Sequence, residues 1–212
     1  MLRFPHVRAL CPLLCFLASP IAAQSYFYIP DNRPSAGPCN VIPWGTQASS
    51  TTWANQRYQV LVRKADLGNN LAPKRICSLA FTPCNGYQHT SATLQITMAQ
   101  TKSATLSTTF ANNLSINPVV VYKGAMHTWP MVQDAWNNVG LQRPYLMIPP
   151  RGENLVIEVI VTRNDNTGAR GRAGFHRAST NDRLFAFGWT GSPPTTGRTP
   201  SRAALKMRLG VL

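Results

Sequence analysis

Acidic side chains are scarce in this chain of 212 residues, which carries 7 Asp and Glu against 21 Lys and Arg. Glycoside hydrolysis by paired carboxylates needs two such groups facing one cleft. The close pair, Glu153 and Glu158, is separated by five positions, which places the two side chains on opposite faces of a strand. We therefore expect ion-paired or surface carboxylates here, and we predict no catalytic residues.

Familiar catalytic and metal-binding motifs are also missing. The chain contains no His-Glu-x-x-His pattern, no Cys-x-x-Cys pattern and no Gly-x-Ser-x-Gly turn. Three histidines follow residue 23: His89, His127 and His176. They are far apart in sequence, and we expect them to be solvated or hydrogen-bonded side chains of loops. We predict neither a metal site nor a cofactor, since three dispersed histidines make a site only if the fold gathers them.

No apolar run is long enough to cross a bilayer. The longest, Ala9 to Ala18, is about half of the roughly 20 residues that a membrane helix needs. It follows Arg3 and Arg8 and precedes small residues ending at Ala23, which is the order of a secretory signal peptide covering residues 1–23. We expect a secreted or extracytoplasmic protein, in the periplasm or cell envelope, without a membrane span.

Helical periodicity is almost absent, and short strand-like runs separated by turn residues take its place. Runs of this kind occur at 58–62, 76–81, 94–98, 119–122, 154–161, 184–187 and 205–209. Only Leu106, Phe110 and Leu114 have helical spacing. The pattern predicts an all-β fold, a single antiparallel β-sandwich that is jelly-roll-like with one short helix. Residues 24–52, rich in Pro, Gly, Ser and Asn, are expected to form an irregular lead-in, and residues 53–212 the sandwich domain.

Three cysteines remain once the signal peptide is removed, enough for one disulfide in an oxidising compartment. Cys77 is spaced by two from Leu79 and Phe81 and is expected to be a small buried side chain of their pleat face. Cys39 and Cys84 both adjoin Pro and Gly residues, typical of loops, so a Cys39–Cys84 bridge is favoured. A Cys77–Cys84 bridge stays open, because sequence alone does not fix connectivity.

Two sets of side chains are candidates for binding. The tryptophans beside loops, Trp44, Trp129 and Trp189, could form a stacking platform for sugars, against core packing as the alternative. Arginines are concentrated toward the end of the chain, and they favour an anionic partner if they share a face: Arg163, Arg170, Arg172, Arg177 and Arg183. The formal charge of +14, or +12 without Arg3 and Arg8, has the same sign.

Several strings in the chain are similar to those of a group of uncharacterised exported bacterial β-sandwich proteins. The strings lie at residues 39–45 (CNVIPWG), 78–84 (SLAFTPC), 106–114 (LSTTFANNL), 154–158 (NLVIE) and 203–208 (AALKMR). The likeness spans nearly all of the chain after the signal peptide. It implies that the cysteines of the first two strings pair with each other, which supports Cys39 with Cys84. It implies no activity and no catalytic residues.

These observations lead to two functional hypotheses. The favoured one is a secreted non-catalytic module, expected to be monomeric, with a structural role or a role in binding an extracellular glycan or other anionic polymer. The alternative is a secreted hydrolase acting on polysaccharide, which would require a groove with two facing carboxylates.

Overall fold

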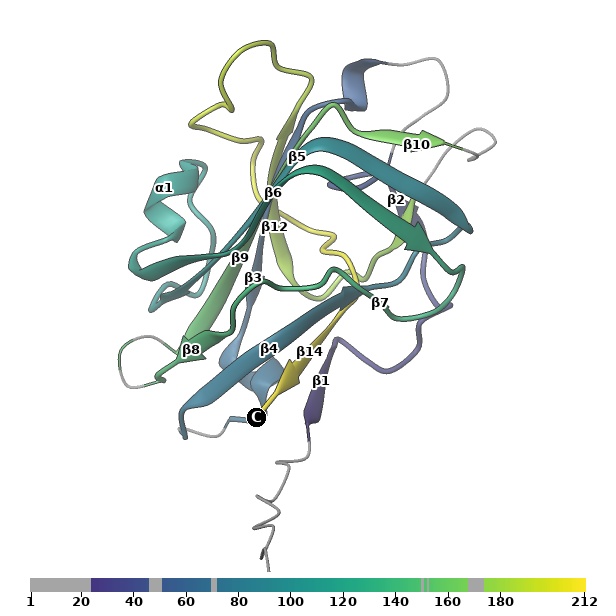
Figure 1. Ribbon diagram of the computed structural model, residues 1–212. Coiled ribbons are helices and arrows are strands. Elements are labelled where there is room, and N and C mark those ends of the chain that lie inside the picture. Colours follow the sequence, from purple (N-terminus) through teal and green to yellow (C-terminus); the bar gives the residue numbers. More distant parts are fainter. Residues whose placement is uncertain (1–23, 46–50, 70–71, 150, 152, 168–173) are drawn as a thin grey trace, which may run out of the picture.

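The computed structural model describes residues 24–45, 51–69, 72–149, 151, 153–167 and 174–212, and the predicted signal peptide lies outside them. Two antiparallel sheets pack face to face and form the body of the fold (Figure 1). The smaller sheet contains β1 (Ser25–Ile29), β14 (Met207–Val211), β4 (Lys74–Phe81), β7 (Asn137–Asn138) and β8 (Tyr145–Met147). The all-β sandwich expected from the alternating pattern is confirmed.

The larger sheet has β5 (Tyr87–Thr101), β9 (Asn154–Thr162) and β3 (Gln56–Val62) as neighbouring central strands. Its other strands are β6 (Ile116–Met131), β10 (Asp165–Thr167), β12 (Asp182–Phe187) and β13 (Ser201–Arg202). A further two-stranded ribbon pairs β2 (Cys39–Asn40) with β11 (Phe175–His176). The chain crosses between the two large sheets from β3 to β4, from β4 to β5, from β6 to β7, from β8 to β9 and from β13 to β14, in the manner of a jelly roll.

Period-two alternation explains how the sheets enclose the core. Along β5, Leu94, Ile96 and Met98 are fully buried between the sheets. Along β14, Met207 and Leu209 face the same core, while Arg208 between them points outward. Each sheet therefore has an apolar face, and the sandwich forms because the apolar faces of the two sheets are buried against each other.

A smaller hydrophobic cluster covers the outer face of the larger sheet. The short helix α1 (Phe110–Asn113) and the segment before it place Leu106 and Phe110 against Leu61, Val156 and Leu184. Leu114 packs against the same cluster. The predicted short helix is confirmed, and its apolar side chains cover the back of the larger sheet.

The segment expected as an irregular lead-in contains a strand, so that prediction was wrong in part. β1 pairs with β14 from Ser25↔Val211 to Ile29↔Met207 and forms an edge of the smaller sheet. Ile29 is buried in the core, and Phe27 packs against it. The run is only five residues long, and the Pro- and Gly-rich stretch that follows it concealed its alternation.

Cys77 also departs from its predicted position. The pairing of β4 with β14 shifts register between Ser78 and Ile76, opposite Gly210 and Val211. This β-bulge turns Ile76 into the core and leaves Cys77 half-exposed, because an extra residue reverses the side-chain alternation beyond it. Among the residues that the structure describes, no helix is long and apolar enough to cross a membrane.

Candidate functional site

The outer face of the smaller sheet presents two rows of side chains that cross its strands. Register places Tyr28, Arg208, Ala80 and Asn138 side by side on β1, β14, β4 and β7. The neighbouring row is Tyr26, Gly210 and Ser78. Tyr26 and Tyr28 point outward because Phe27 and Ile29, which alternate with them, are held in the core.

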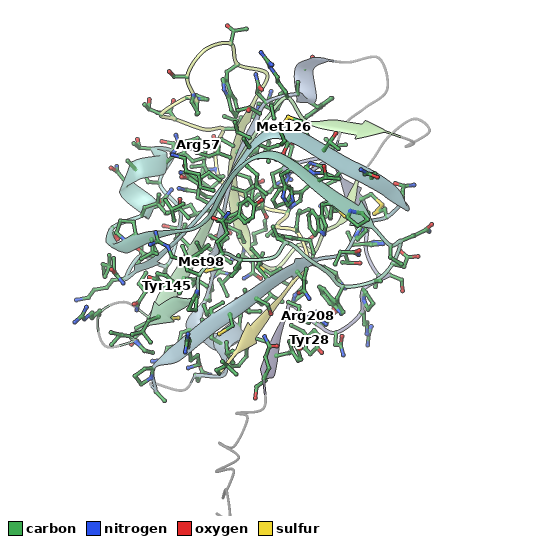
Figure 2. The ribbon with its side chains drawn as sticks, viewed as in Figure 1. Tyr28, Arg57, Met98, Met126, Tyr145 and Arg208 are labelled. Atoms are coloured by element: carbon green, nitrogen blue, oxygen red, sulfur yellow. A yellow bond between two sulfur atoms is a disulfide. The ribbon has the colours of Figure 1, made fainter. Side chains whose placement is uncertain are left out.

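Three aromatic rings and a guanidinium group gather on this surface, and Figure 2 shows Tyr28 and Arg208 next to each other there. The ring centroids of Tyr26 and Tyr28 are 6.3 Å apart, and those of Tyr28 and Trp136 are 5.6 Å apart. The guanidinium carbon of Arg208 lies 4.6 Å from the ring centroid of Tyr26 and 6.0 Å from that of Trp136. We call Tyr26, Tyr28, Trp136 and Arg208 the aromatic face.

Neutral polar groups hold the rings in place. The indole Nε1 of Trp136 donates to Asn32 Oδ1 at 3.0 Å. The hydroxyl of Tyr26 donates to Gln24 Oε1 at 3.3 Å, and the Gln24 amide donates to Ser78 Oγ at 3.0 Å. A Cβ at Gly210 would collide with both of those last side chains, so the glycine makes room for this network.

Comparisons with protein-family models, curated proteins and solved structures give no match. Function is therefore inferred from the side chains and their surroundings.

Two of the three tryptophans predicted to stack on sugars are core residues, so that prediction was wrong for them. Trp44 is fully buried and Trp129 is 5% exposed, and their ring centroids lie 5.4 Å apart in an edge-to-face contact. Trp189 is half-buried, and its indole nitrogen lies inside the protein. Position beside a loop did not reveal burial, because these loops fold over the end of the sandwich. The rings of the aromatic face come from β1 and the segment after β6, which the sequence gave no reason to combine.

The predicted arginine cluster is divided. Arg170 and Arg172 lie outside the described residues. Arg163 follows β9 beyond the Gln56 end of β3, whereas Arg183 lies opposite Val60 toward the other end of that strand. Burial lowers the pKa of Arg183, Tyr58 opposes this shift, and the charge of Arg177 adds a smaller lowering, so Arg177 lies near Arg183. Among the three arginines that the structure describes, Arg163 therefore lies apart from Arg177 and Arg183.

Arg183 instead belongs to an edge of the larger sheet that includes two arginines the sequence did not single out. Its guanidinium carbon lies 4.7 Å from the ring centroid of Phe185, and that of Arg198 lies 4.6 Å from the ring centroid of Phe187. Arg202 on β13 is 72% exposed. We call Arg177, Arg183, Arg198 and Arg202 the arginine edge. Asp182 offsets part of its charge by pairing with Arg63 and approaching Arg202.

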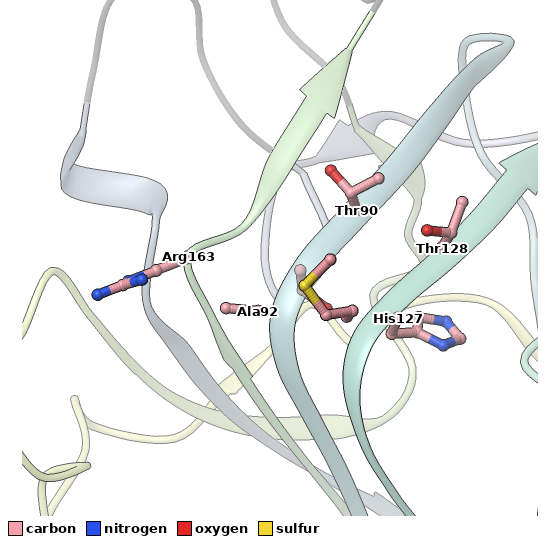
Figure 3. Close-up of a pocket in the computed structure, with 7 residues that line it drawn as sticks. Thr90, Ala92, His127, Thr128 and Arg163 are labelled. Atoms are coloured by element: carbon pink, nitrogen blue, oxygen red, sulfur yellow. The ribbon is translucent and has the colours of Figure 1, made fainter.

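Two grooves lie along β5 and β6. The first, of about 380 Å³, is shown in Figure 3, where Thr90 and Ala92 on β5 face Thr128 on β6 and Arg163 stands at one side. The second, of about 480 Å³, is lined by residues including Gln95, Lys123 and Pro193. Neither set of described lining residues contains a carboxylate or a Phe, Tyr or Trp side chain. These grooves therefore offer neither the acid–base pair of a glycosidase nor a stacking surface.

Two histidines expected on loops are packed inside the sandwich. His89 and His127 lie on β5 and β6, with ring centroids 6.2 Å apart. His89 is fully buried against Trp44 and Trp129. Burial, with a smaller effect from His127, lowers the pKa of His89 to about 3, and the nearby Asn164 side chain opposes the shift. The alternating β5 run was recognised only from Leu94 onward, so the sequence did not show that the strand begins before His89.

Acidification is expected to destabilise the fold through His89. Its pKa in the folded protein lies below its ordinary value of 6.5, so the proton binds preferentially to the unfolded chain. Stability therefore falls as the pH drops below 6.5, by about 1.4 kcal/mol per pH unit until about pH 3. Urea unfolding at pH 7 and pH 5 should show a loss of about 2 kcal/mol from this residue. In a His89→Gln variant, the free energy of unfolding should fall by about 2 kcal/mol less between pH 7 and pH 5 than in the wild-type protein. If both proteins lost the same amount, His89 would not be the cause of the acid sensitivity.

Glu158 is buried in a polar network on the back of the larger sheet. Its side chain is 3% exposed and its Oε2 accepts from Arg57 Nη2 at 2.8 Å and from Gln59 Nε2 at 2.9 Å. The same arginine donates to the carbonyl of Pro194 and lies 4.3 Å from the ring centroid of Phe110. Burial raises the pKa of Glu158, while Arg57 and Gln59 act in the opposite direction. The expected ion pair is present, and Glu153 pairs elsewhere, with Lys64 at 3.2 Å.

The disulfide joins Cys39 to Cys84, the pairing favoured by the loop positions. The imidazole of His176 lies next to it and contacts Asp134 Oδ1 through Nε2 at 2.7 Å and the Gly37 carbonyl through Nδ1 at 3.0 Å. Cys39, Cys84 and His176 are the one group of metal-ligating side chains that meets in the described chain. Since the two sulfur atoms are bonded to each other, they are not thiolate ligands for a metal.

Proposed function

We propose that this protein is a non-catalytic, extracytoplasmic glycan-binding module that uses the aromatic face. The observation that carries the proposal is the group of three rings on an outward sheet surface, with Tyr26 42% exposed. Tyr28 and Trp136 are half-buried beside Tyr26, and an apolar patch rimmed by polar groups is typical of a binding surface.

The chemistry of the face suits sugars. Tyrosine and tryptophan combine an apolar ring with a polar group, so they pack against the C–H groups of a sugar while hydrogen bonds form at the rim. Asn32, Asn138 and Ser78 surround the rings with donors and acceptors for hydroxyl groups. An outer sheet face with such a rim is open along its length, which suits an extended polysaccharide better than a small compact molecule, because small molecules bind mostly in enclosed pockets.

Removing a ring from the face is expected to weaken glycan binding about tenfold, because covering one aromatic side chain stabilises a complex by about 1–2 kcal/mol. The variants are Tyr28→Ala and Trp136→Ala, tested by affinity electrophoresis in gels containing neutral or acidic polysaccharides and by calorimetry on those retained. Trp189→Ala is the matched control, since it removes a half-buried ring away from the aromatic face.

Circular dichroism and thermal unfolding would verify that each variant is folded. Loss of binding in Trp189→Ala with normal binding in Trp136→Ala would place the ligand elsewhere. Failure of the wild-type protein to bind any polysaccharide of the panel would exclude the proposed function.

A further inference from the structure

Arg208 occupies the middle of the aromatic face and is oriented entirely by neutral groups. It stacks on Tyr26, and its Nη2 donates to Asn138 Oδ1 at 3.3 Å. Its Nε is buried, so the outer end of the guanidinium group is the part that can meet a ligand. Stacking on aromatic rings fixes the plane of the guanidinium group, which lowers the conformational entropy lost when an anion binds.

The charge of Arg208 is not matched by a carboxylate in the part of the chain that the structure describes. The ion pairs found there join Asp31 to Lys206, Asp134 to His176, Glu153 to Lys64, Glu158 to Arg57, and Asp182 to Arg63 and Arg202. Asp66 accepts hydrogen bonds from the Arg63 backbone and Asn181 instead. The surface arginines of a protein with seven carboxylates and a formal charge of +14 cannot all be paired internally. Arg208 lies over the exposed ring of Tyr26 and 6.0 Å from the half-buried ring of Trp136.

A planar cation beside stacking rings is suited to a sugar that carries a carboxylate. When a sugar ring lies on an aromatic ring, its substituents project sideways, toward groups at the same height above the sheet. A guanidinium group at that height can donate two parallel hydrogen bonds to a carboxylate, an arrangement that neutral amides cannot match in strength. The positive charge of the whole protein raises the rate of encounter with such a polymer.

We infer that the aromatic face selects acidic polysaccharides, specifically those containing uronic acids, and that Arg208 recognises the sugar carboxylate. This inference rests on the proposed glycan-binding function and names the substrate class of the same surface. Tyr26, Tyr28 and Trp136 supply contact that is shared by neutral and acidic sugars. Arg208 supplies the preference for the acidic ones.

The test compares polymers that differ only in charge. Polygalacturonate, alginate and hyaluronate are each presented beside their methyl esters, which keep the sugar backbone and remove the negative charge. Binding is measured by calorimetry for the wild-type protein, for Arg208→Gln and for Arg202→Gln. The last variant is the matched control, because it removes the same charge from the exposed arginine edge.

For at least one acid–ester pair, the wild-type protein should bind the acid more tightly than the ester. Arg208→Gln should weaken binding of the acid about tenfold, the loss typical of a hydrogen-bonded ionic contact. The same variant should leave binding of the ester unchanged, which also shows that the aromatic face is intact. Arg202→Gln should change neither affinity appreciably, since a distant exposed charge is screened by salt.

Equal binding of acid and ester by the wild-type protein, with no effect of Arg208→Gln, would overturn the inference and leave the glycan-binding function standing. An equal loss in Arg202→Gln would also overturn it, since it would show a response to total charge. If the wild-type protein binds none of these polymers but retains a neutral polysaccharide through Trp136, selectivity for acids is wrong. If it binds no polysaccharide at all, the proposed function fails first.

Discussion

Replacing Cys39 and Cys84 together by serine is expected to lower the free energy of unfolding by about 4 kcal/mol. The bridge closes a loop with a sequence separation of 45, and cross-linking a loop of that length restricts the unfolded chain by about this amount in the chain-entropy model. For a domain of this size, the loss corresponds to a fall in melting temperature of roughly 10 °C. Differential scanning calorimetry would measure it.

The control for this experiment is Cys77→Ser. Cys77 is unpaired and half-exposed on the bulged part of β4, so its replacement should change stability by less than about 0.5 kcal/mol. A large loss in Cys77→Ser, or full stability in the double-serine variant, would contradict the role assigned to the bridge.

Replacing Arg57 by methionine is expected to cost about 3–5 kcal/mol, because Glu158 would be left buried without its cation. The aliphatic part of methionine preserves contact with Phe110, so lost packing contributes less than the unpaired charge. Urea unfolding at neutral pH measures the loss. Lys64→Met serves as the comparison: it removes the cation from the exposed Lys64–Glu153 pair and should cost less than about 1 kcal/mol.

A double variant separates charge from packing at this site. Arg57→Met combined with Glu158→Leu removes both charges, and it should be more stable than Arg57→Met alone, since hydrophobic replacements of a buried ion pair are often tolerated. If the double variant lost the sum of the two single losses, the pair would not be coupled. Equal costs for Arg57→Met and Lys64→Met would show that the surroundings of Glu158 are effectively aqueous.

The strand pattern of this protein could be predicted from its sequence because burial on one sheet face leaves a period of two. Leu94, Ile96 and Met98 show that period and lie between the sheets. The loop positions of Cys39 and Cys84 also favoured the disulfide that the structure contains. The wrong predictions have local causes that the alternating pattern does not reveal. The bulge opposite Gly210 reverses the exposure of Cys77. The strand β1 is only five residues long and precedes a Pro- and Gly-rich stretch, so its pattern was not recognised.

The aromatic face was harder to predict than the fold because it is assembled across strands. Tyr28 and Arg208 are far apart in sequence and become neighbours only through the register of β1 on β14. Trp136 joins them from the segment before β7, held by Asn32. Tryptophan content suggested stacking on sugars, but two of the three residues that it indicated, Trp44 and Trp129, are buried in the core.

The edge position of β1 has a consequence for how the protein matures. β1 precedes the other described strands in the chain, whereas β14, its partner in the sheet, follows them. During synthesis, Tyr26 and Tyr28 therefore have no partner strand until β14 has been made. The aromatic face can therefore form only once β14 is present, and a truncated product lacking residues 207–211 would lose both Arg208 and the strand against which the two tyrosines are ordered.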